Sequence, residues 1–495
     1  MTGSEEAQPT GARMPARLLR GLGTPLRAAT KDGAGRATES ERLRSPQPLL
    51  KRRLPSGRGA TEQPNITSDG EAALTPRFWL MVILTGIATG LFGALLMLLL
   101  FNVQYLAFGY HTGSLQQGVE QASALRRVCS LLIAGAFGGG AWFLLRRYTK
   151  GEHSEIDEAI WTHGGKLSFR RSLGTSVISE VVIGMGASIG REAAPKLLGG
   201  ASASVLAGWA GLSTQQRRLL VACGGGAGLA AVYNVPFAGA LFTAEILCGS
   251  MSLPVILPAL ACSCIATATA WIYLPDHATY RAIPDYRLSG SLMVFSLLVS
   301  PLIGLISAGY IRLLGWVSHH RMSGLRALFA PLFAFAVVGM IGIWYPQLFG
   351  NGKDMARDAF AGLGGIGLSF TLFALKPAVT ALCLESGASG GVFTPTLSTG
   401  AVLGGGLGMT WSLIWPGSPA GAYAMIGAAM QAPLAGLALV LELTHTGFSL
   451  MVPMAAATAI ATAVAFYLDG YSIYSARLPS RPPGWRTDQA VTQPE

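Results

Sequence analysis

A glutamate and an arginine stand side by side in an otherwise apolar stretch, and they are the residues there best suited to chemistry. Arg191 and Glu192 lie in GASIGREAAP, residues 186–195. An ionisable group at membrane depth is costly and marks a functional site by default. Glycines let the backbone turn, and Pro195 favours a fresh helix whose unpaired N–H groups attract an anion. The segment predicts an anion site that Glu192 blocks when ionised and releases when protonated.

Two plainer interpretations of these residues remain open. Arg191 and Glu192 could form a structural ion pair, or Glu192 could be a carboxylate at a helix N-terminus without any gating role. Neighbours in a helix do not face each other, which counts against the pair.

A second segment repeats this construction without charge. GASGGVFTP, residues 387–395, places Gly391 where the first segment has Gly190, and Val392 and Phe393 follow it. Its backbone amides are expected to line the other side of the same ion site. A simple turn between two helices is the alternative for this motif taken alone.

The repetition extends downstream and indicates an internal duplication. Paired segments broken by Gly and Pro, each among apolar residues, point to a transport site, because irregular backbone at membrane depth must line a cavity or be wrapped in protein. We therefore expect a permeation pathway between two halves. The downstream repeat pairs Asn234-x-Pro236-x-Ala238-Gly239 and Glu245 with Gln431-x-Pro433-x-Ala435-Gly436 and Glu442.

Composition predicts an all-α polytopic membrane protein. Of the 495 residues, 51% are hydrophobic and 12% are charged, and a span needs about 20 apolar residues. Residues 174–247 and 362–468 are also apolar, but Gly and Pro divide them into tilted, broken pieces. The clear apolar runs are Phe78–Phe108, Val128–Leu145, Leu253–Leu274, Ser291–Val317 and Leu328–Trp344.

Charge predicts the orientation and the division of the chain. Residues 1–77 are rich in Arg, Gly, Pro and Ser and are expected to be a disordered cytoplasmic tail. Basic residues stay inside, so topology rather than nucleic acid explains the net charge of +11. The expected parts are a first membrane repeat, a linker, a second repeat and a short cytoplasmic tail, at residues 78–274, 275–289, 290–478 and 479–495.

Other candidate residues are individually weak. Glu180 and Glu245 lie in apolar segments, and each could handle protons, cap a helix end or be a buried hydrogen-bonded partner. Tyr474 follows the last apolar run and alone would be a residue of the aromatic belt. The six cysteines are read as core residues. No catalytic motif, metal site or cofactor is expected, so we do not expect an enzyme.

These motifs resemble the CLC family of chloride channels and chloride/proton exchangers, in particular its bacterial ClcB-like branch. The resemblance runs from Phe78 to Leu478. GREAAP is similar to the family's Gly-Arg/Lys-Glu-Gly-Pro, GGVFTP to Gly-Gly-Ile/Val-Phe-x-Pro, and a Tyr stands near the end of the last helix.

The resemblance implies two inverted-topology repeats and a homodimer with one pore per subunit in a bacterial inner membrane, with both termini cytoplasmic. Glu192 would be the gate, and the backbone around Gly190, Arg191 and Gly391 to Phe393 would bind chloride. Tyr474 would offer its hydroxyl from the inner side.

The chain departs from the family at three positions. Gly151 replaces a chloride-binding serine, Ala193 replaces a glycine beside the gate, and Ile246 replaces the internal glutamate of the exchangers. Isoleucine carries no proton, so coupling would have to run through Glu245, Glu180 or water.

A voltage- or pH-gated chloride channel that acts as an electrical shunt is therefore the leading hypothesis. An obligate chloride/proton antiporter is the alternative. A proton-coupled carrier of organic solutes is a remote one, because polar residues are scarce in the predicted core.

Overall fold

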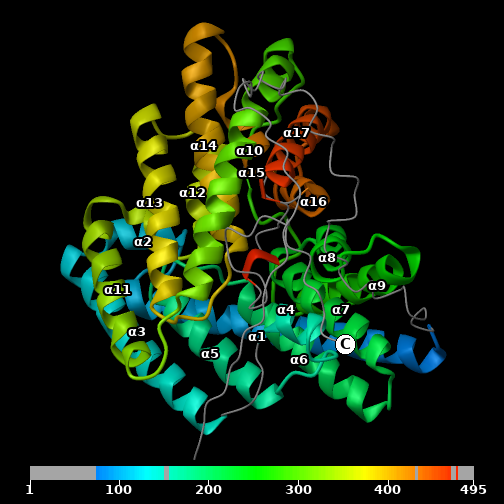
Figure 1. Ribbon diagram of the computed structural model, residues 1–495. Coiled ribbons are helices and arrows are strands. Elements are labelled where there is room, and N and C mark those ends of the chain that lie inside the picture. The colour runs from blue at the N-terminus through cyan, green and yellow to red at the C-terminus, as the bar shows by residue number, and fades with distance from the viewer. Residues whose placement is uncertain (1–73, 150–154, 282, 430–432, 470–474, 478–495) are drawn as a thin grey trace, which may run out of the picture. The chain divides into compact units, whose positions relative to one another are not determined.

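The computed structural model describes residues 74–149, 155–281, 283–429, 433–469 and 475–477, and these are helical almost throughout (Figure 1). Eight helices in this part are long and apolar enough to cross a membrane. Five of them coincide with the five runs expected from the sequence: α1 (Pro76–Phe108), α3 (Ala124–Tyr148), α9 (Leu253–Ala270), α10 (Gly290–His319) and α11 (Arg326–Trp344). The other three are α13 (Ile366–Glu385), α14 (Phe393–Ile414) and α17 (Met451–Asp469).

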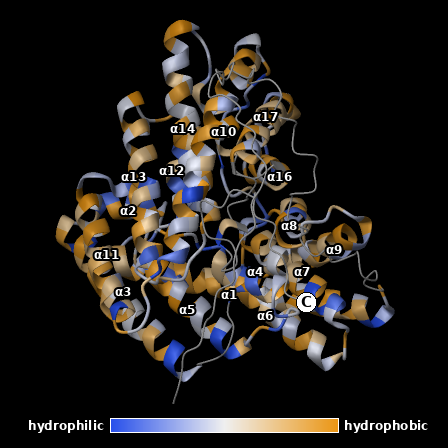
Figure 2. Ribbon diagram, viewed as in Figure 1, coloured by the Kyte–Doolittle hydropathy of each residue, from blue (hydrophilic) through white to orange (hydrophobic). Residues whose placement is uncertain are grey.

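Apolar side chains lie on the outside of these helices as well as in the core. Figure 2 shows hydrophobic residues recurring along each long helix. On α1, Leu95 is 54% exposed, and on α11 Phe333 is 68% exposed. Exposed apolar side chains of this number indicate a surface that faces lipid hydrocarbon rather than water. The chain is a multi-pass, all-α membrane protein.

Local signals explain where the first helix begins and ends. Thr75 accepts a hydrogen bond from the backbone N–H of Phe78, and Pro76 occupies the first helical position, where its missing N–H costs nothing. Gly109 ends the helix with a φ of 72°, a left-handed conformation that glycine adopts without strain. The first span is therefore bounded by its own residues.

The apolar regions broken by Gly and Pro form shorter helices. Their bounds are α5 (Phe169–Gly184), α6 (Ala193–Trp209), α7 (Thr214–Tyr233), α8 (Pro236–Phe242) with a π-helical turn η2 (Thr243–Leu247), α15 (Ala420–Ala429) and α16 (Pro433–Thr444). The remaining elements are α2 (Leu115–Gln121), α4 (Ile156–Trp161), α12 (Lys353–Phe360) and the short turns η3 (Pro346–Leu348), η4 (Phe448–Leu450) and η5 (Ser475–Arg477).

Packing repeats along with the sequence. In the first half α5 packs on α6 and α6 on α7, and in the second half α13 packs on α14 and α14 on α15. Likewise α1 packs on α9 as α10 packs on α17. The pairs α3 with α11 and α8 with α16 join the halves; α3 and α11 lie side by side in Figure 1. The duplication predicted from the motifs is thus confirmed, as two inverted repeats.

The two tails predicted from the sequence, residues 1–77 and 479–495, lie largely outside the described residues. Gly151 and Tyr474, for which the sequence also made predictions, lie outside them too.

Candidate functional site

The two repeated motifs meet in space and satisfy each other's backbone. The N–H of Gly190 donates to the carbonyl of Gly391, and the N–H of Gly391 donates to the carbonyl of Gly190, both at 2.7 Å. The pair is antiparallel, as expected for equivalent residues of inverted repeats. Gly186 and Gly387, which open the two motifs, have φ values of 109° and 97°, a conformation that strains other residues. The helix breaks therefore leave these groups paired at membrane depth.

The carboxylate of Glu192 is bound by the start of α14. The backbone N–H of Phe393 donates to Oε1 at 2.7 Å, and that of Thr394 at 3.2 Å. The hydroxyl of Thr394 donates to Oε2 at 2.9 Å. Glu192 is fully buried, so these bonds replace the water it has lost. A negative group thus occupies the N-terminus of a helix, where the dipole and the free N–H groups favour an anion.

The arrangement differs in one respect from the expected one. The sequence places the anion site between the helix that follows Glu192 and the backbone amides of the second motif, and the structure shows Glu192 bound at the second of these alone. The helix that follows Glu192, α6, begins directly at Ala193, and Glu192 makes no side-chain cap on it. The carboxylate reaches instead into the partner repeat. Among the described residues no ion pair joins Arg191 to Glu192.

The absence of side chains at two glycines makes room for this carboxylate. A Cβ at Gly190 would collide with both carboxylate oxygens of Glu192, and a Cβ at Gly391 would collide with Oε1. Val392, the next residue, is buried and precedes the first turn of α14. The repeated glycines thus form the walls of the pocket that holds the gate candidate.

Tyr233 is part of this site and was not recognised from the sequence. Its hydroxyl lies 2.6 Å from Oγ1 of Thr394 and 3.5 Å from Oε2 of Glu192. The amide of Asn351 donates to it at 3.2 Å and Nε of Arg191 at 3.4 Å. Its place just before the repeated Asn-x-Pro block was the one available signal.

Arg191 packs against the aromatic rings of Tyr233 and Phe101. Its guanidinium carbon lies 4.9 Å from the ring centre of Tyr233 and 5.9 Å from that of Phe101. Such contacts hold a cation without neutralising it. Arg191 therefore adds positive potential next to the gate.

Lys376 on α13 is a second buried cation, and it also escaped the sequence reasoning. It is fully buried, and its ammonium donates to Oγ of Ser188 at 2.8 Å and to the carbonyls of Gly350 at 2.8 Å and Leu348 at 3.2 Å. Ser188 belongs to the motif that carries Glu192. A lysine in a span is itself a functional signal that could have found it.

The two other carboxylates proposed for protons occupy different environments. Glu245, on η2, accepts hydrogen bonds from the backbone N–H groups of Leu434 and Ala435 and caps α16. Glu180, on α5, is fully buried, and neither of its oxygens has a hydrogen-bond partner among the described residues. The charges that act on it are those of Arg191 and Glu192.

A small cavity of about 70 Å³ lies on the side of Gly391 and Val392 that faces α4 and α6. Its polar lining combines hydroxyl groups with both acidic and basic side chains: Thr175, Ser176, Ser179, Ser389, Glu155, Asp157, Lys196, Arg321 and Arg477. The hydroxyl of Ser179 is already used, because it donates to the carbonyl of Ser389 at 2.6 Å.

Comparison with known proteins identifies the family. Residues 134–466, well over half of the chain, match the family described as voltage gated chloride channel. Proteins named voltage-gated ClC-type chloride channel ClcB from Salmonella typhi and Shigella flexneri are each 29% identical, over 75% of this chain and over 92% and 91% of their own.

Solved structures agree on the fold. A slow cyanobacterial Cl⁻/H⁺ antiporter superposes with a TM-score of 0.70 at 24% identity, and a CLC-type fluoride/proton antiporter with 0.66 at 18%. Each alignment covers 81% of this chain and 97% of the other. With this fold, these motifs and a family match over most of its membrane part, the chain belongs to the voltage gated chloride channel (CLC) family.

Proposed function

We propose that this protein conducts chloride across a bacterial inner membrane through a pathway that Glu192 closes when ionised and opens when protonated. One observation carries the proposal: the carboxylate of Glu192 accepts hydrogen bonds from the backbone N–H groups of Phe393 and Thr394, where a permeating anion would be bound. A carboxylate and a chloride ion compete for the same donors. Protonation weakens the carboxylate as an acceptor and frees them.

Neutral donors suit a conducted ion. Backbone N–H groups and hydroxyls attract chloride without a full positive charge, so the ion can leave again. Arg191, packed against Tyr233, and Lys376, bonded to Ser188, bring full charges close to this site and raise the local anion concentration instead. Tyr474, proposed as the inner hydroxyl ligand, lies outside the described residues.

Passive conduction is our first choice because Ile246 stands where an exchanger would need an ionisable side chain. The buried, unpartnered carboxylate of Glu180 favours a second candidate, chloride/proton antiport, since a carboxyl group in that setting could take up a proton and pass it towards Glu192. The ClcB relatives are named as channels, and the solved neighbours as antiporters.

The assembly and orientation belong to the same proposal. We place both termini in the cytoplasm, with the α3–α5 region and its basic residues Arg146, Arg147 and Arg170 inside. We also propose a homodimer with one pathway in each subunit, as the resemblance to the family implies. A cross-linking and topology assay on the membrane-embedded protein tests these points together.

Reversal potentials in planar bilayers decide between the two mechanisms. Under a chloride gradient alone, both give a potential. When a pH gradient is added, a channel keeps the chloride potential, whereas an exchanger shifts it by a fixed stoichiometry. In the second case Glu180→Gln should abolish the shift while chloride flux persists.

Glu192→Gln tests the gate. The variant should conduct at a rate that no longer depends on pH, because its amide cannot be ionised. Glu158→Gln on α4 is the matched control and should keep the wild-type pH profile. An unchanged profile in Glu192→Gln would remove Glu192 from its assigned role.

A further inference from the structure

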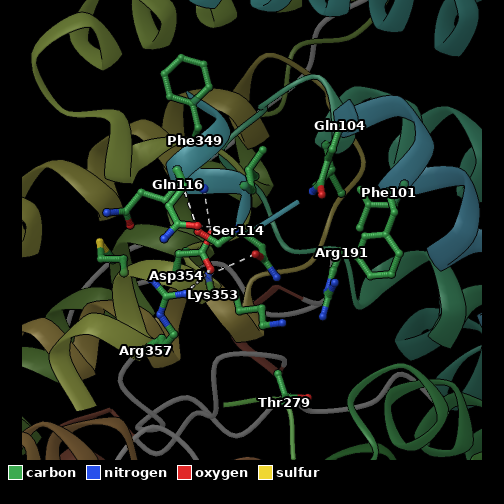
Figure 3. A pocket seen from close by; sticks show the side chains of 18 of the residues that line it. Phe101, Gln104, Ser114, Gln116, Arg191, Thr279, Phe349, Lys353, Asp354 and Arg357 are labelled. Carbon is green, nitrogen blue, oxygen red and sulfur yellow. Dashed lines mark hydrogen bonds and ion pairs between the residues drawn. The ribbon is translucent and has the colours of Figure 1, made fainter. Parts of the chain in front are cut away.

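A second, larger cavity is lined by Arg191 and Asn351, which both donate to the Tyr233 hydroxyl near the bound carboxylate. It has a volume of about 430 Å³ and lies between α1, α2, the chain before α10 and the start of α12 (Figure 3). Because one water takes up about 30 Å³ of liquid and small-molecule pockets begin near 300 Å³, this space exceeds what a bare halide ion needs. It has room for a polyatomic ligand.

The lining is strongly cationic. Among the described residues that line the cavity, the basic ones are Arg191, Arg281, Lys353 and Arg357, and the acidic one is Asp354. Asp354 is already engaged: Oδ2 accepts the backbone N–H of Gln116 at 2.9 Å, and Oδ1 lies 3.9 Å from Arg357. Arg357 is in turn held by Asp358 at 2.8 Å. The carboxylate of Asp354 is therefore already bound at one edge of the cavity by Gln116 and Arg357.

Of these cations, Arg191, Arg281 and Lys353 make no ion pair with a described carboxylate; Arg281 is exposed, which leaves Arg191 and Lys353 as the two that are shielded from water. Both side chains extend into the cavity (Figure 3). Arg191 is held by aromatic rings and by the Tyr233 hydroxyl, and the described carboxylates make no ion pair with either cation. Burial and the charge of Arg191 lower the pKa of Lys353 to about 8, so each cation disfavours the other.

The backbone adds to this positive environment. Lys353 is the first residue of α12; Gly352 before it has no side chain to cap the helix, and the backbone N–H of Lys353 donates to Oδ1 of Asn351 at 3.2 Å. The positive end of the helix dipole therefore points towards the same space. Two full charges and a helix end in one cavity require more than one negative charge for balance.

We propose that this cavity binds a polyatomic anion with two negative charges, of the sulfate or small dicarboxylate class, between Arg191 and Lys353. A monovalent ion would compensate one cation and leave the other, whereas a dianion pairs with both through charge-assisted hydrogen bonds. Tyr105, Tyr110 and Gln104 provide the polar wall on the side of α1. Two lining residues, Arg191 and Asn351, bond the Tyr233 hydroxyl that lies 3.5 Å from Glu192, so a dianion bound here occupies the space next to the gate and blocks chloride entry; this consequence rests on the proposed function.

Calorimetric titration of sulfate into the purified full-length protein, in chloride-free gluconate buffer, tests the binding directly. Wild type should bind sulfate saturably, and Lys353→Met should weaken binding by at least about tenfold, the loss expected for one charged partner. Lys353→Arg should retain it, which shows that the charge matters. Lys166→Met, an exposed lysine far from the cavity lining, is the matched control and should bind as wild type.

Saturable binding that Lys353→Met leaves intact, or an absence of sulfate binding in wild type, overturns the inference. Gel filtration of each variant excludes unfolding as the cause of a loss. Chloride flux with sulfate on one side of the bilayer then separates the two proposals: binding without any chloride conduction would reject the proposed function and leave the dianion site standing.

Discussion

The hydroxyl of Tyr233 lies 3.5 Å from Oε2 of Glu192 and connects the gate candidate to the large cavity. Since the Thr394 hydroxyl gives its proton to Glu192, Tyr233 donates to Thr394 and receives the amide hydrogen of Asn351. A hydrogen-bonded chain therefore runs from a residue that lines the cavity to the buried carboxylate.

Removal of the Tyr233 hydroxyl should make the gate easier to protonate. Tyr233→Phe deletes the donor to the Thr394 hydroxyl and a 3.5 Å contact with the carboxylate, which together support its ionised form, a net loss of about 1 kcal/mol. The pH of half-maximal chloride flux should rise by somewhat less than about one unit, since one unit corresponds to about 1.4 kcal/mol. Flux measured against pH in liposomes checks this, and a midpoint that stays in place or falls would contradict the chain.

A methyl group at Gly391 should expel the carboxylate from its pocket. Gly391→Ala places a Cβ against Oε1 of Glu192, so flux should lose most of its pH dependence, as in Glu192→Gln. Gly405→Ala, in the helix α14 that follows Gly391, is the control, because its Cβ would meet Ala424 at an ordinary 3.5 Å. A Gly391→Ala protein with wild-type pH dependence would show that the pocket has more room than described.

Sulfate binding should weaken as pH rises through the pKa of Lys353. That pKa is lowered to about 8, so the side chain is charged below this pH and neutral above it. Sulfate remains divalent, and affinity should therefore fall between about pH 7 and about pH 9. Lys353→Arg should show a flat profile. The other charged or titratable groups that line the cavity are Arg191, Arg281, Asp354, Arg357, His277, Tyr105 and Tyr110.

A pH profile of wild type as flat as that of Lys353→Arg would mean that Lys353 does not contact the anion. Burial raises the pKa of Tyr110 above its usual value, so that hydroxyl would not mimic the expected fall.

Lys376→Met should destabilise the protein. The variant leaves the carbonyls of Leu348 and Gly350 and the hydroxyl of Ser188 without their donor, at about 1–3 kcal/mol for each group that finds no other partner. Part of this loss in the free energy of unfolding is offset, because the variant no longer has to bury a charged ammonium group. The midpoint of thermal unfolding in detergent should fall relative to wild type and Lys166→Met. An equal midpoint would assign the lysine a purely electrostatic role.

The sequence predicted the parts of this molecule that are local or repeated. Continuous apolar runs located α1 and α10, and the matching motifs brought Gly190 and Gly391 together, because a duplicated chain places equivalent segments about its symmetry axis. It could not show that Glu192 reaches across to α14, since the acceptor lies in the other repeat and depends on how the two halves are docked.

The site residues that the sequence did not predict are single residues without a counterpart in the other repeat. Tyr233 reads as an ordinary aromatic residue at a helix end, and its four polar contacts come from three other segments. For Glu245 the sequence left three roles open, and the structure shows it at a helix end. Such choices depend on tertiary contacts, which spacing alone does not encode.

The cap on α16 has an exact counterpart in the other direction. Glu442 of α16 accepts the backbone N–H groups of Phe237 at 3.1 Å and Ala238 at 2.7 Å, as Glu245 accepts those of Leu434 and Ala435 at 3.1 and 2.7 Å. Each half thus completes a helix of the other. Neither half can satisfy the backbone N–H groups at its own helix start when it folds alone. Both halves must therefore be inserted into the bilayer and packed together before these N–H groups have their hydrogen-bond acceptors.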